Sequence, residues 1–308
     1  MGVVFILISG AAFGLLPWFA RTAFDHGVEP LGLLTARFTI ATIVLLIVRL
    51  ITQRGKPWPK RVLALQLFSL GAFGYAIQSS FYFFGIQRID VSLATIIFYS
   101  YPVTVVLAGW ALFGHKPTPR MGVCLVVVVV GTALTAGQVQ SGSVTGVLFM
   151  VGASVTYTVY ILFSSRVVHK AGALTSLLYV MFGSACAHLL AYPLHHSNLP
   201  SDRIGWAAVI GATFVSTIIA MGFFFAGISR LEPGIASVLS TTEPVVSIAV
   251  GVFALNESLT LVRIVGALAV LAGVAVLAQL SRATGQQSQI HDSSEQSSEQ
   301  SSQQSHHD

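Results

Sequence analysis

One acidic residue inside a long apolar run is the strongest candidate for chemistry in this sequence. Glu243 stands in S-T-T-E-P-V-V, and residues 234–255 around it contain no other charged side chain. At the centre of a bilayer a charged group costs about 2.5–3.5 kcal/mol even on the lenient insertion scale. We therefore expect Glu243 to have a partner or a function. It would be a protonatable site, a contact for the amino group of a bound molecule, or a structural pair with Arg37.

Other polar residues follow a helical spacing. Tyr75, Gln78, Ser79 and Tyr82 recur at i, i+3, i+4 and i+7, so they share one face of a helix. Polar side chains on an apolar helix turn away from lipid, either to bond neighbouring helices or to line a cavity. We interpret the serines as contacts between helices. Gln78, Tyr82 and Tyr99 are predicted to line a cavity.

Two prolines stand at corresponding places in the two halves of the chain. Pro102 and Pro244 both fall near the middle of apolar runs, and each removes a backbone hydrogen bond to the carbonyl four residues earlier. In lipid such a carbonyl must face protein or water. The prolines are interpreted as a pair of kinks beside a central cavity, although kinks used only for packing are the alternative.

The predicted cavity also needs aromatic walls, for which Trp18 and Tyr157 are candidates with core packing as the alternative. The expected lining consists of Trp18, Tyr75, Gln78, Tyr82, Tyr99, Tyr157, Ser240 and Glu243. Ser184 and His188 share a helix face, but neighbours on one helix do not aim at a common substrate atom, and nothing supplies an oxyanion hole. We therefore interpret His188 as a packed or pore-edge residue rather than part of a protease site.

The elements that carry these residues are helices in a membrane. Apolar residues make up 54% of the 308 and charged residues only 9%, whereas soluble domains carry about 25% charged residues. Apolar runs of about 20 residues, the length that spans a bilayer, occur ten times. They are 3–22, 31–51, 62–86, 91–113, 121–138, 144–166, 173–194, 204–228, 234–255 and 260–281. The connections are short, so the function must lie within the membrane.

The chain repeats itself with a period of about half its length. Residues 81–109 align without a gap with residues 223–251, matching F-x-F-x-G-I-x-R in both copies and then the prolines Pro102 and Pro244. Each half has an odd number of helices, so the second half must enter the membrane from the opposite side. An inverted repeat of this kind is typical of secondary transporters.

Loop charges predict the orientation, because cytoplasmic loops carry the excess of Lys and Arg. With both termini inside, eleven Lys and Arg residues fall on the cytoplasmic side and four outside, with Arg37 left within a helix. The sequence therefore predicts a multi-pass inner-membrane protein with both termini in the cytoplasm. The polar segment 282–308 is expected to be a disordered tail.

The second half resembles the end of an EamA domain. The resemblance rests on L-E-P at 231–233, T-E-P-V at 242–245, A-L-N-E-S at 254–258 and the glycines Gly266 to Gly273. It implies the drug/metabolite transporter fold, an all-α membrane protein of ten transmembrane helices in two inverted five-helix repeats, at 1–140 and 141–281. Within that superfamily the chain is most similar to bacterial exporters of aromatic amino acids. One departure is His115, which stands where Glu257 stands in the second half.

Three functional classes follow from these patterns: a secondary transporter, an intramembrane enzyme, and a passive channel. The sequence has no G-x-x-x-x-G-K-[ST] loop for ATP and no loop cluster of metal ligands. Cys124 and Cys186 lie in apolar runs and are interpreted as small buried hydrophobic residues. We expect no cofactor, no metal, no nucleic-acid partner, and no catalytic residues. The partners are then a small molecule and the lipid bilayer, with a monomer as the working hypothesis.

The best interpretation is a transporter that exports aromatic or other neutral amino acids, or similar metabolites, by alternating access. The amino acid class and the direction of export follow from the resemblance alone.

Overall fold

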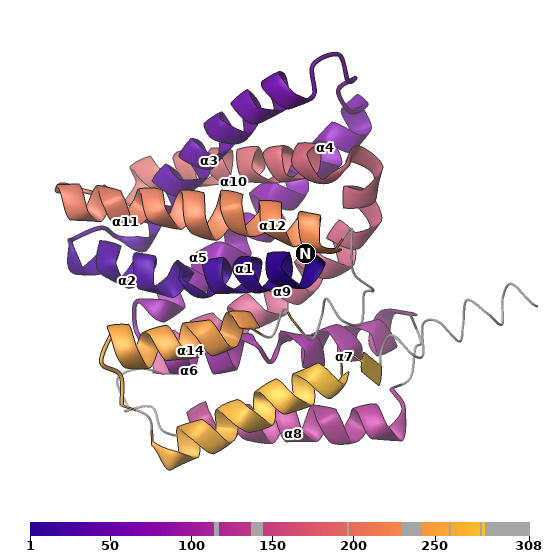
Figure 1. The fold of residues 1–308 in the computed structure, drawn as a ribbon, viewed down its shortest axis with the longest axis vertical. Coiled ribbons are helices and arrows are strands. Elements are labelled where there is room, and N and C mark those ends of the chain that lie inside the picture. The colour runs from indigo at the N-terminus through magenta and orange to yellow at the C-terminus, as the bar shows by residue number, and fades with distance from the viewer. Residues whose placement is uncertain are drawn as a thin grey trace, which may run out of the picture.

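The computed structural model describes residues 1–113, 117–136, 144–195, 197–228, 239, 242–258, 260–277 and 279–280. All regular elements in these ranges are helices, and most of them lie with their axes roughly along one direction while the chain crosses back and forth (Figure 1). Those of the first half are α1 (Gly2–Gly14), α2 (Leu16–Asp25), α3 (Pro30–Thr52), α4 (Arg61–Ser69), η1 (Leu70–Tyr75), α5 (Ala76–Ile86), α6 (Val91–Phe98), α7 (Tyr101–Phe113) and α8 (Pro119–Ala136). The remainder are α9 (Val144–Ala171), α10 (Ala173–His195), α11 (Arg203–Thr213), η3 (Phe214–Ile219), α12 (Ala220–Ile228), α14 (Thr242–Ala254) and an unlabelled helix at Leu261–Leu277.

These helices confirm the prediction of an all-helical membrane protein. In the described ranges, seven spans are long and apolar enough to cross a bilayer, and three shorter apolar helices occupy the remaining predicted runs. Large apolar side chains lie exposed along the outer faces, among them Phe253 at 85% and Leu190 at 76%. Exposing such large apolar side chains to water is unfavourable, whereas lipid tails solvate them well.

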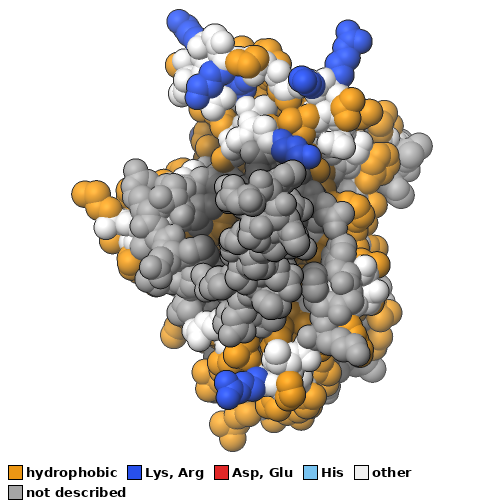
Figure 2. All heavy atoms as spheres, turned by 90° about the vertical axis from the view of Figure 1, so that its right-hand side faces the viewer, with side chains coloured by type: hydrophobic (Ala, Val, Ile, Leu, Met, Phe, Trp, Pro, Cys, Tyr) orange, Lys and Arg blue, Asp and Glu red, His pale blue; other side chains and the backbone are white. Residues whose placement is uncertain are grey.

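Basic side chains are exposed at one end of the bundle. In Figure 2, which faces this end, Lys and Arg side chains stand mainly in the upper part and at the lower edge, beside apolar side chains. The connection from α3 to α4 supplies exposed Arg54, Lys56 and Lys60 at this end. These three residues are among the eleven Lys and Arg residues that the sequence predicts on the cytoplasmic side.

Several predicted helices are interrupted. The run 91–113 divides into α6 and α7 with a turn at Tyr99 and Ser100, so the predicted kink at Pro102 is found as a break just before that residue. The first run divides at Leu15, shortly before Pro17, a break that the sequence analysis did not foresee. Pro244 lies in the first turn of α14. Residues 240 and 241, which precede this helix, lie outside the described ranges, so the predicted kink at Pro244 stays a prediction.

Two helices contain a turn of π-helix. η1 joins α4 to α5, and η3 joins α11 to α12, so the π turns occur at similar places in the two halves. A π turn inserts a residue into the helical ladder and often marks a functional site. Hydropathy alone does not reveal such a turn.

The helices pack into two apolar clusters. The larger cluster joins α2, α3, α5, α6, α9, α10 and α11, and is centred on side chains such as Phe38, Phe83 and Met181. The smaller one joins α6 and α7 to α8 and the helix Leu261–Leu277 through Val103, Val128 and Val270. In Figure 1, α8 and Leu261–Leu277 accordingly lie together at the bottom of the molecule.

Two predicted boundaries fall on residues outside the described ranges. The division between residues 140 and 141 lies within 137–143, which the structure does not describe. The polar tail 282–308 lies wholly beyond residue 280, the last residue described. Both stay predictions.

At one end of the bundle an exposed polar contact joins α2 to α11. Asp202 caps the start of α11 by accepting a hydrogen bond from the Gly205 N–H at 2.7 Å, and His26 Nδ1 lies 2.6 Å from its other oxygen. The hydrogen bond from Gly205, with a smaller contribution from His26, lowers the pKa of Asp202 below its ordinary value.

Candidate functional site

A cavity of about 1010 Å³ lies among the interrupted helices. Its walls come from α1, α2, α3, η1, α5, α6, α7, α9, α12, α14 and the helix Leu261–Leu277, so both halves of the chain contribute. The breaks at Leu15 and at Tyr99 and Ser100 adjoin it, as does the first turn of α14. A cavity of this size is ample for a small metabolite, since typical ligand pockets measure about 300–1,000 Å³.

Most of the predicted lining residues meet in this cavity. Tyr75, Gln78, Tyr82, Tyr99, Tyr157 and Glu243 line it, as do both predicted kink residues, Pro102 and Pro244. Gln78 and Tyr82, which share a face of α5, both line the cavity. Ser240 lies outside the described residues.

Trp18 is the exception, and the structure corrects its assignment. Its side chain is 38% exposed and packs against Phe19 at 5.2 Å between ring centroids, on the outside of α2. The break at Leu15 separates α1 from α2, so the face of α1 that reaches the cavity through Gly10 and Phe13 does not continue to Trp18.

Aromatic rings form the largest part of the wall. Phe98 lies in the middle of the cluster, with ring centroids of Tyr82 at 5.2 Å, Tyr157 at 5.3 Å and Tyr101 at 5.7 Å. Tyr101 and Tyr157 meet edge to face at 4.8 Å. The aromatic side chains of the lining are Phe13, Tyr75, Tyr82, Phe83, Phe98, Tyr99, Tyr101, Tyr157, Tyr160 and Phe224. Such contacts hold the rings in fixed orientations.

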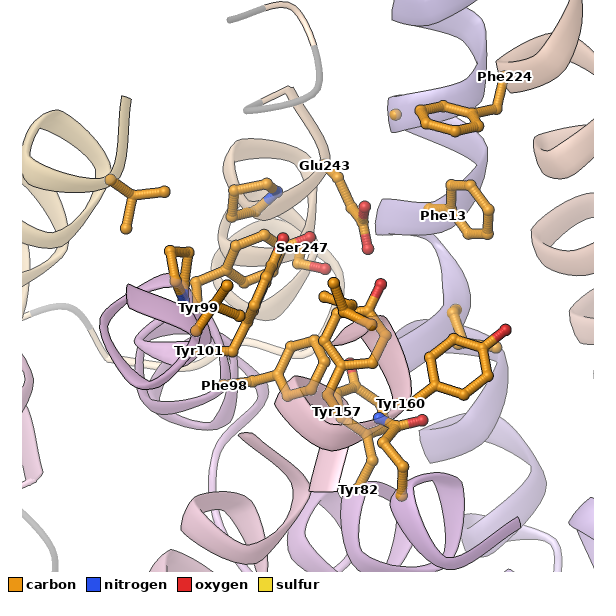
Figure 3. A pocket seen from close by; sticks show the side chains of 18 of the residues that line it. Phe13, Tyr82, Phe98, Tyr99, Tyr101, Tyr157, Tyr160, Phe224, Glu243 and Ser247 are labelled. Atoms are coloured by element: carbon orange, nitrogen blue, oxygen red, sulfur yellow. The ribbon is translucent and has the colours of Figure 1, made fainter. Parts of the chain in front are cut away.

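Glu243 faces these rings. Figure 3 shows its side chain extending from the start of α14 toward the cluster that includes Tyr99 and Tyr157. The Tyr99 side chain interacts with the Glu243 carboxyl group. Among the described residues, no Lys, Arg or His lies within 4.0 Å of that carboxyl group. The structural pair of Glu243 with Arg37, one of the alternatives from the sequence, is therefore absent.

Close backbone packing fixes the place of Glu243. The Ser247 hydroxyl donates to the Gly14 carbonyl oxygen at 3.1 Å, which ties α14 to the last residue of α1. A Cβ atom at Gly14 would lie 2.8 Å from the Glu243 carbonyl oxygen, so only glycine permits this approach. The contacts of Gly14, the last residue of α1, thus position the first turn of α14 and with it the Glu243 side chain.

Several lining residues were not predicted from the sequence. Tyr101, immediately before Pro102, would have been indicated by its position at the break. Arg37, which the sequence left within a helix or paired with Glu243, is only 2% exposed and lines the cavity. The rotation of a helix about its axis decides which of its side chains face the cavity. A single charged residue shows no periodic pattern, so the sequence does not predict which way it faces.

His188 and Ser184 are explained by packing. Ser184 donates to the Gly71 carbonyl oxygen at 3.0 Å, and the two ring nitrogens of His188 contact the Ser184 carbonyl oxygen at 2.7 Å and the Ser80 hydroxyl at 3.1 Å. These contacts join α10 to η1 and α5. The Ser184 hydroxyl is thus not aimed at the His188 ring.

An interrupted helical bundle around a membrane-embedded cavity is the architecture of a membrane transporter. The model of the EamA-like transporter family matches residues 1–137 and again residues 144–279, so the chain belongs to this family. The protein is accordingly a multi-pass membrane transporter with a two-repeat helical fold. Its partners are a small-molecule substrate and membrane lipid, and an intramembrane enzyme is no longer a competing class.

Known proteins with similar sequences are also transporters. The chain is 24% identical over 279 residues to the uncharacterized transporter YcbK of Bacillus subtilis (strain 168), covering 86% of this chain and 88% of that protein. It is 23% identical over 276 residues to the threonine/homoserine exporter RhtA of Escherichia coli (strain K12), covering 88% of both. A solved crystal structure shares the fold, with a TM-score of 0.64 at 20% identity over 91% of this chain and 98% of that one.

Proposed function

We propose that the protein is a secondary transporter that exports amino acids or similar small metabolites across the inner membrane by alternating access. The observation that carries this proposal is the central cavity, which both halves of the chain line and which adjoins the helix breaks at Leu15 and at Tyr99 and Ser100. Rocking of two repeats around a fixed central site is the usual route of exchange in transporters with inverted repeats.

The amino acid class is supported from two directions. A relative that aligns over 88% of this chain is named a threonine/homoserine exporter. The cavity itself combines one acidic and one basic side chain with neutral polar groups, which suits a small molecule that carries both charges. Aromatic or other neutral amino acids are the finer proposal, because ten aromatic rings line the walls.

Individual residues take roles within this proposal. Tyr82, Tyr99 and Tyr157 pack against the apolar part of the substrate. Gln78, 5% exposed and facing the cavity, bonds its polar end, and Glu243 contacts its amino group or carries a coupling proton. The carbonyl of Ser240, which the sequence predicts to be left unbonded by Pro244, belongs to the same proposal.

The proposed orientation puts both termini in the cytoplasm. The cluster of exposed basic residues between α3 and α4 supports it, because cytoplasmic loops carry the excess of Lys and Arg. A single cysteine at Asn198 should react with an impermeant reagent added to intact cells, while one at Gly55 should not. The reverse pattern of labelling would refute the orientation.

Selectivity tests the assignment of the site. In proteoliposomes we would measure counterflow of phenylalanine, methionine, threonine and lysine for the wild type and for Gln78→Ala, Tyr82→Ala and Tyr99→Ala. At least one of these changes should alter the ranking among substrates, because truncating a ring that packs on the substrate affects large apolar side chains most. Loss of a buried aromatic contact is worth about 0.5–1.5 kcal/mol beyond area burial, or several-fold in relative rate.

Tyr179→Ala is the matched control. Its ring packs on Trp58 at 6.4 Å, away from the cavity, so this variant should scale all rates alike. Unchanged rates and an unchanged ranking in all three cavity variants, with thermal stability verified, would move the binding site elsewhere.

A further inference from the structure

Arg37 is a buried basic residue for which the proposed function has not yet supplied a role. It belongs to α3 and lies within the membrane span Pro30–Thr52, where its side chain is 2% exposed. It also lines the central cavity, together with Tyr75, Gln78 and Tyr82. Arg37 is the only Lys or Arg among the described lining residues.

Neutral groups hold the guanidinium in place. Its Nε and Nη2 atoms both donate to the Thr217 hydroxyl oxygen, at 3.0 and 2.8 Å. The rings of Phe38 and Phe83 lie 5.4 and 5.5 Å from its central carbon, and the Tyr75 side chain interacts with it as well. These contacts fix the orientation of the guanidinium without neutralising its charge.

The two polar partners are related by the internal repeat. Thr217 stands 142 positions after Tyr75, the same offset that aligns Phe81 with Phe223. Tyr75 belongs to η1 and Thr217 to η3, the π turns of the two halves. Arg37 therefore lies where the two halves meet, between equivalent positions of both.

Other buried arginines of the described chain are satisfied differently. Arg263 forms an ion pair with Asp90 at 2.6 Å. Arg49, on the same helix as Arg37, donates to the carbonyl oxygens of Gln53 and Pro57 and packs on Trp58 at 4.5 Å. Arg37 has no carboxylate within 4.0 Å among the described residues. A buried charge without a counter-ion is strongly unfavourable, and in a membrane span it marks a substrate or ion pathway.

We propose that Arg37 is the anion-recognition residue of the cavity and binds the carboxylate of the transported molecule. The inference rests on the proposed function and narrows it to substrates with a carboxylate. A guanidinium forms paired hydrogen bonds with a carboxylate, which supplies the missing counter-ion.

The charge balance of the cavity favours a zwitterion over other anions. One guanidinium and one carboxyl group, Glu243, are the charged side chains among the described lining residues. A phosphate, with a charge of about −2 and three acceptor oxygens, would meet too little positive charge and would be repelled by Glu243. A substrate with one carboxylate and one ammonium group satisfies both side chains.

Pairs of compounds that differ by one charged group test the inference. We would measure how well each unlabelled compound competes with labelled phenylalanine or threonine in counterflow. The pairs are phenylalanine with phenethylamine and threonine with 1-amino-2-propanol, in which the carboxylate is missing. For the wild type we expect the amino acid to compete at least about tenfold better than the amine, since hydrogen bonds to a charged group are worth about 1.5–3 kcal/mol.

Variants then show which residue causes the preference for the amino acid over the amine. Arg37→Gln should reduce the preference for the amino acid over the amine to about twofold or less, while Arg37→Lys should keep part of it, because lysine retains the charge without the paired geometry. Arg49→Gln is the control, since it makes the same change on the same helix outside the cavity, and its preference should equal that of the wild type. If Arg37→Gln does not fold, Arg37→Lys and the wild-type preference carry the test.

Each outcome decides between the two proposals. Equal competition by amino acid and amine in the wild type, or a full preference in a folded Arg37→Gln protein, would overturn the role of Arg37 and leave the transporter proposal intact. Absence of counterflow for any amino acid in the wild type would overturn the proposed substrate class, and the role of Arg37 with it.

Discussion

Glu243 and Arg37 show what a charged residue in a membrane span implies. Both line one cavity, and the contacts that the structure records for them are with neutral groups such as Tyr99 and Thr217. Burial of a charge without a counter-ion is unfavourable, so neither residue is explained by stability. We interpret both as parts of the transport site.

The residue-scale prediction concerns Glu243→Gln. If the carboxyl group binds and releases a proton during transport, this change should abolish the dependence of the transport rate on a pH gradient. The protein should remain folded, because the amide preserves shape and removes a buried charge. Transport in proteoliposomes with and without an imposed gradient provides the measurement.

A stable Glu243→Gln protein whose rate still follows the gradient would exclude proton coupling at this position. The double variant Arg37→Gln, Glu243→Gln supplies a control for hidden coupling between the two charges. Both side chains line one cavity without an ion pair within 4.0 Å, so the double-mutant cycle of thermal stability measures any interaction between them.

At the scale of elements, close glycine contacts let helices approach at the π turns. A Cβ atom at Gly183 in α10 would lie 2.2 Å from the Phe68 carbonyl oxygen, and one at Gly71 in η1 would lie 2.1 Å from the Val180 carbonyl oxygen. These are backbone atoms, which cannot move aside as a flexible side chain does. The glycines therefore permit the close approach of α10 to α4 and η1, next to α5, which carries Gln78 and Tyr82.

We predict that Gly183→Ala destabilises the protein, because the added methyl group forces the two helices apart. Overpacking of this kind costs about 1–3 kcal/mol. Thermal unfolding in detergent measures the effect. Gly222→Ala is the control, since nothing lies within 4 Å of its added Cβ atom, and this variant should unfold at the same temperature or slightly higher. Equal unfolding temperatures for Gly183→Ala and the wild type would show that this contact is loose.

The elements also show which features a sequence reveals. Apolar length located ten helical runs, because the bilayer imposes a length that hydropathy detects directly. The i, i+3, i+4, i+7 spacing placed Gln78 and Tyr82 on the inward face. The break at Leu15 and the π turns left no trace in hydropathy, and Trp18 was misassigned because that break ends the inward face of α1.

At the scale of the whole molecule, polar contacts tie the second half of the chain to the first. At the start of α6, the Glu257 carboxylate accepts hydrogen bonds from the Val91 N–H and from the N–H and hydroxyl of Ser92. Arg263 pairs with Asp90 beside them at 2.6 Å. All of these contacts join the second half of the chain to the first.

In the proposed mechanism the cavity exchanges its contents by alternating access rather than as an open channel. Counterflow in proteoliposomes distinguishes the two mechanisms, with vesicles preloaded with unlabelled amino acid and a trace of labelled amino acid outside. A carrier exchanges one molecule for another, so the label should accumulate transiently above its equilibrium level in preloaded vesicles and not in empty ones. Equal uptake by preloaded and empty vesicles, without a transient excess, would exclude alternating access for this substrate.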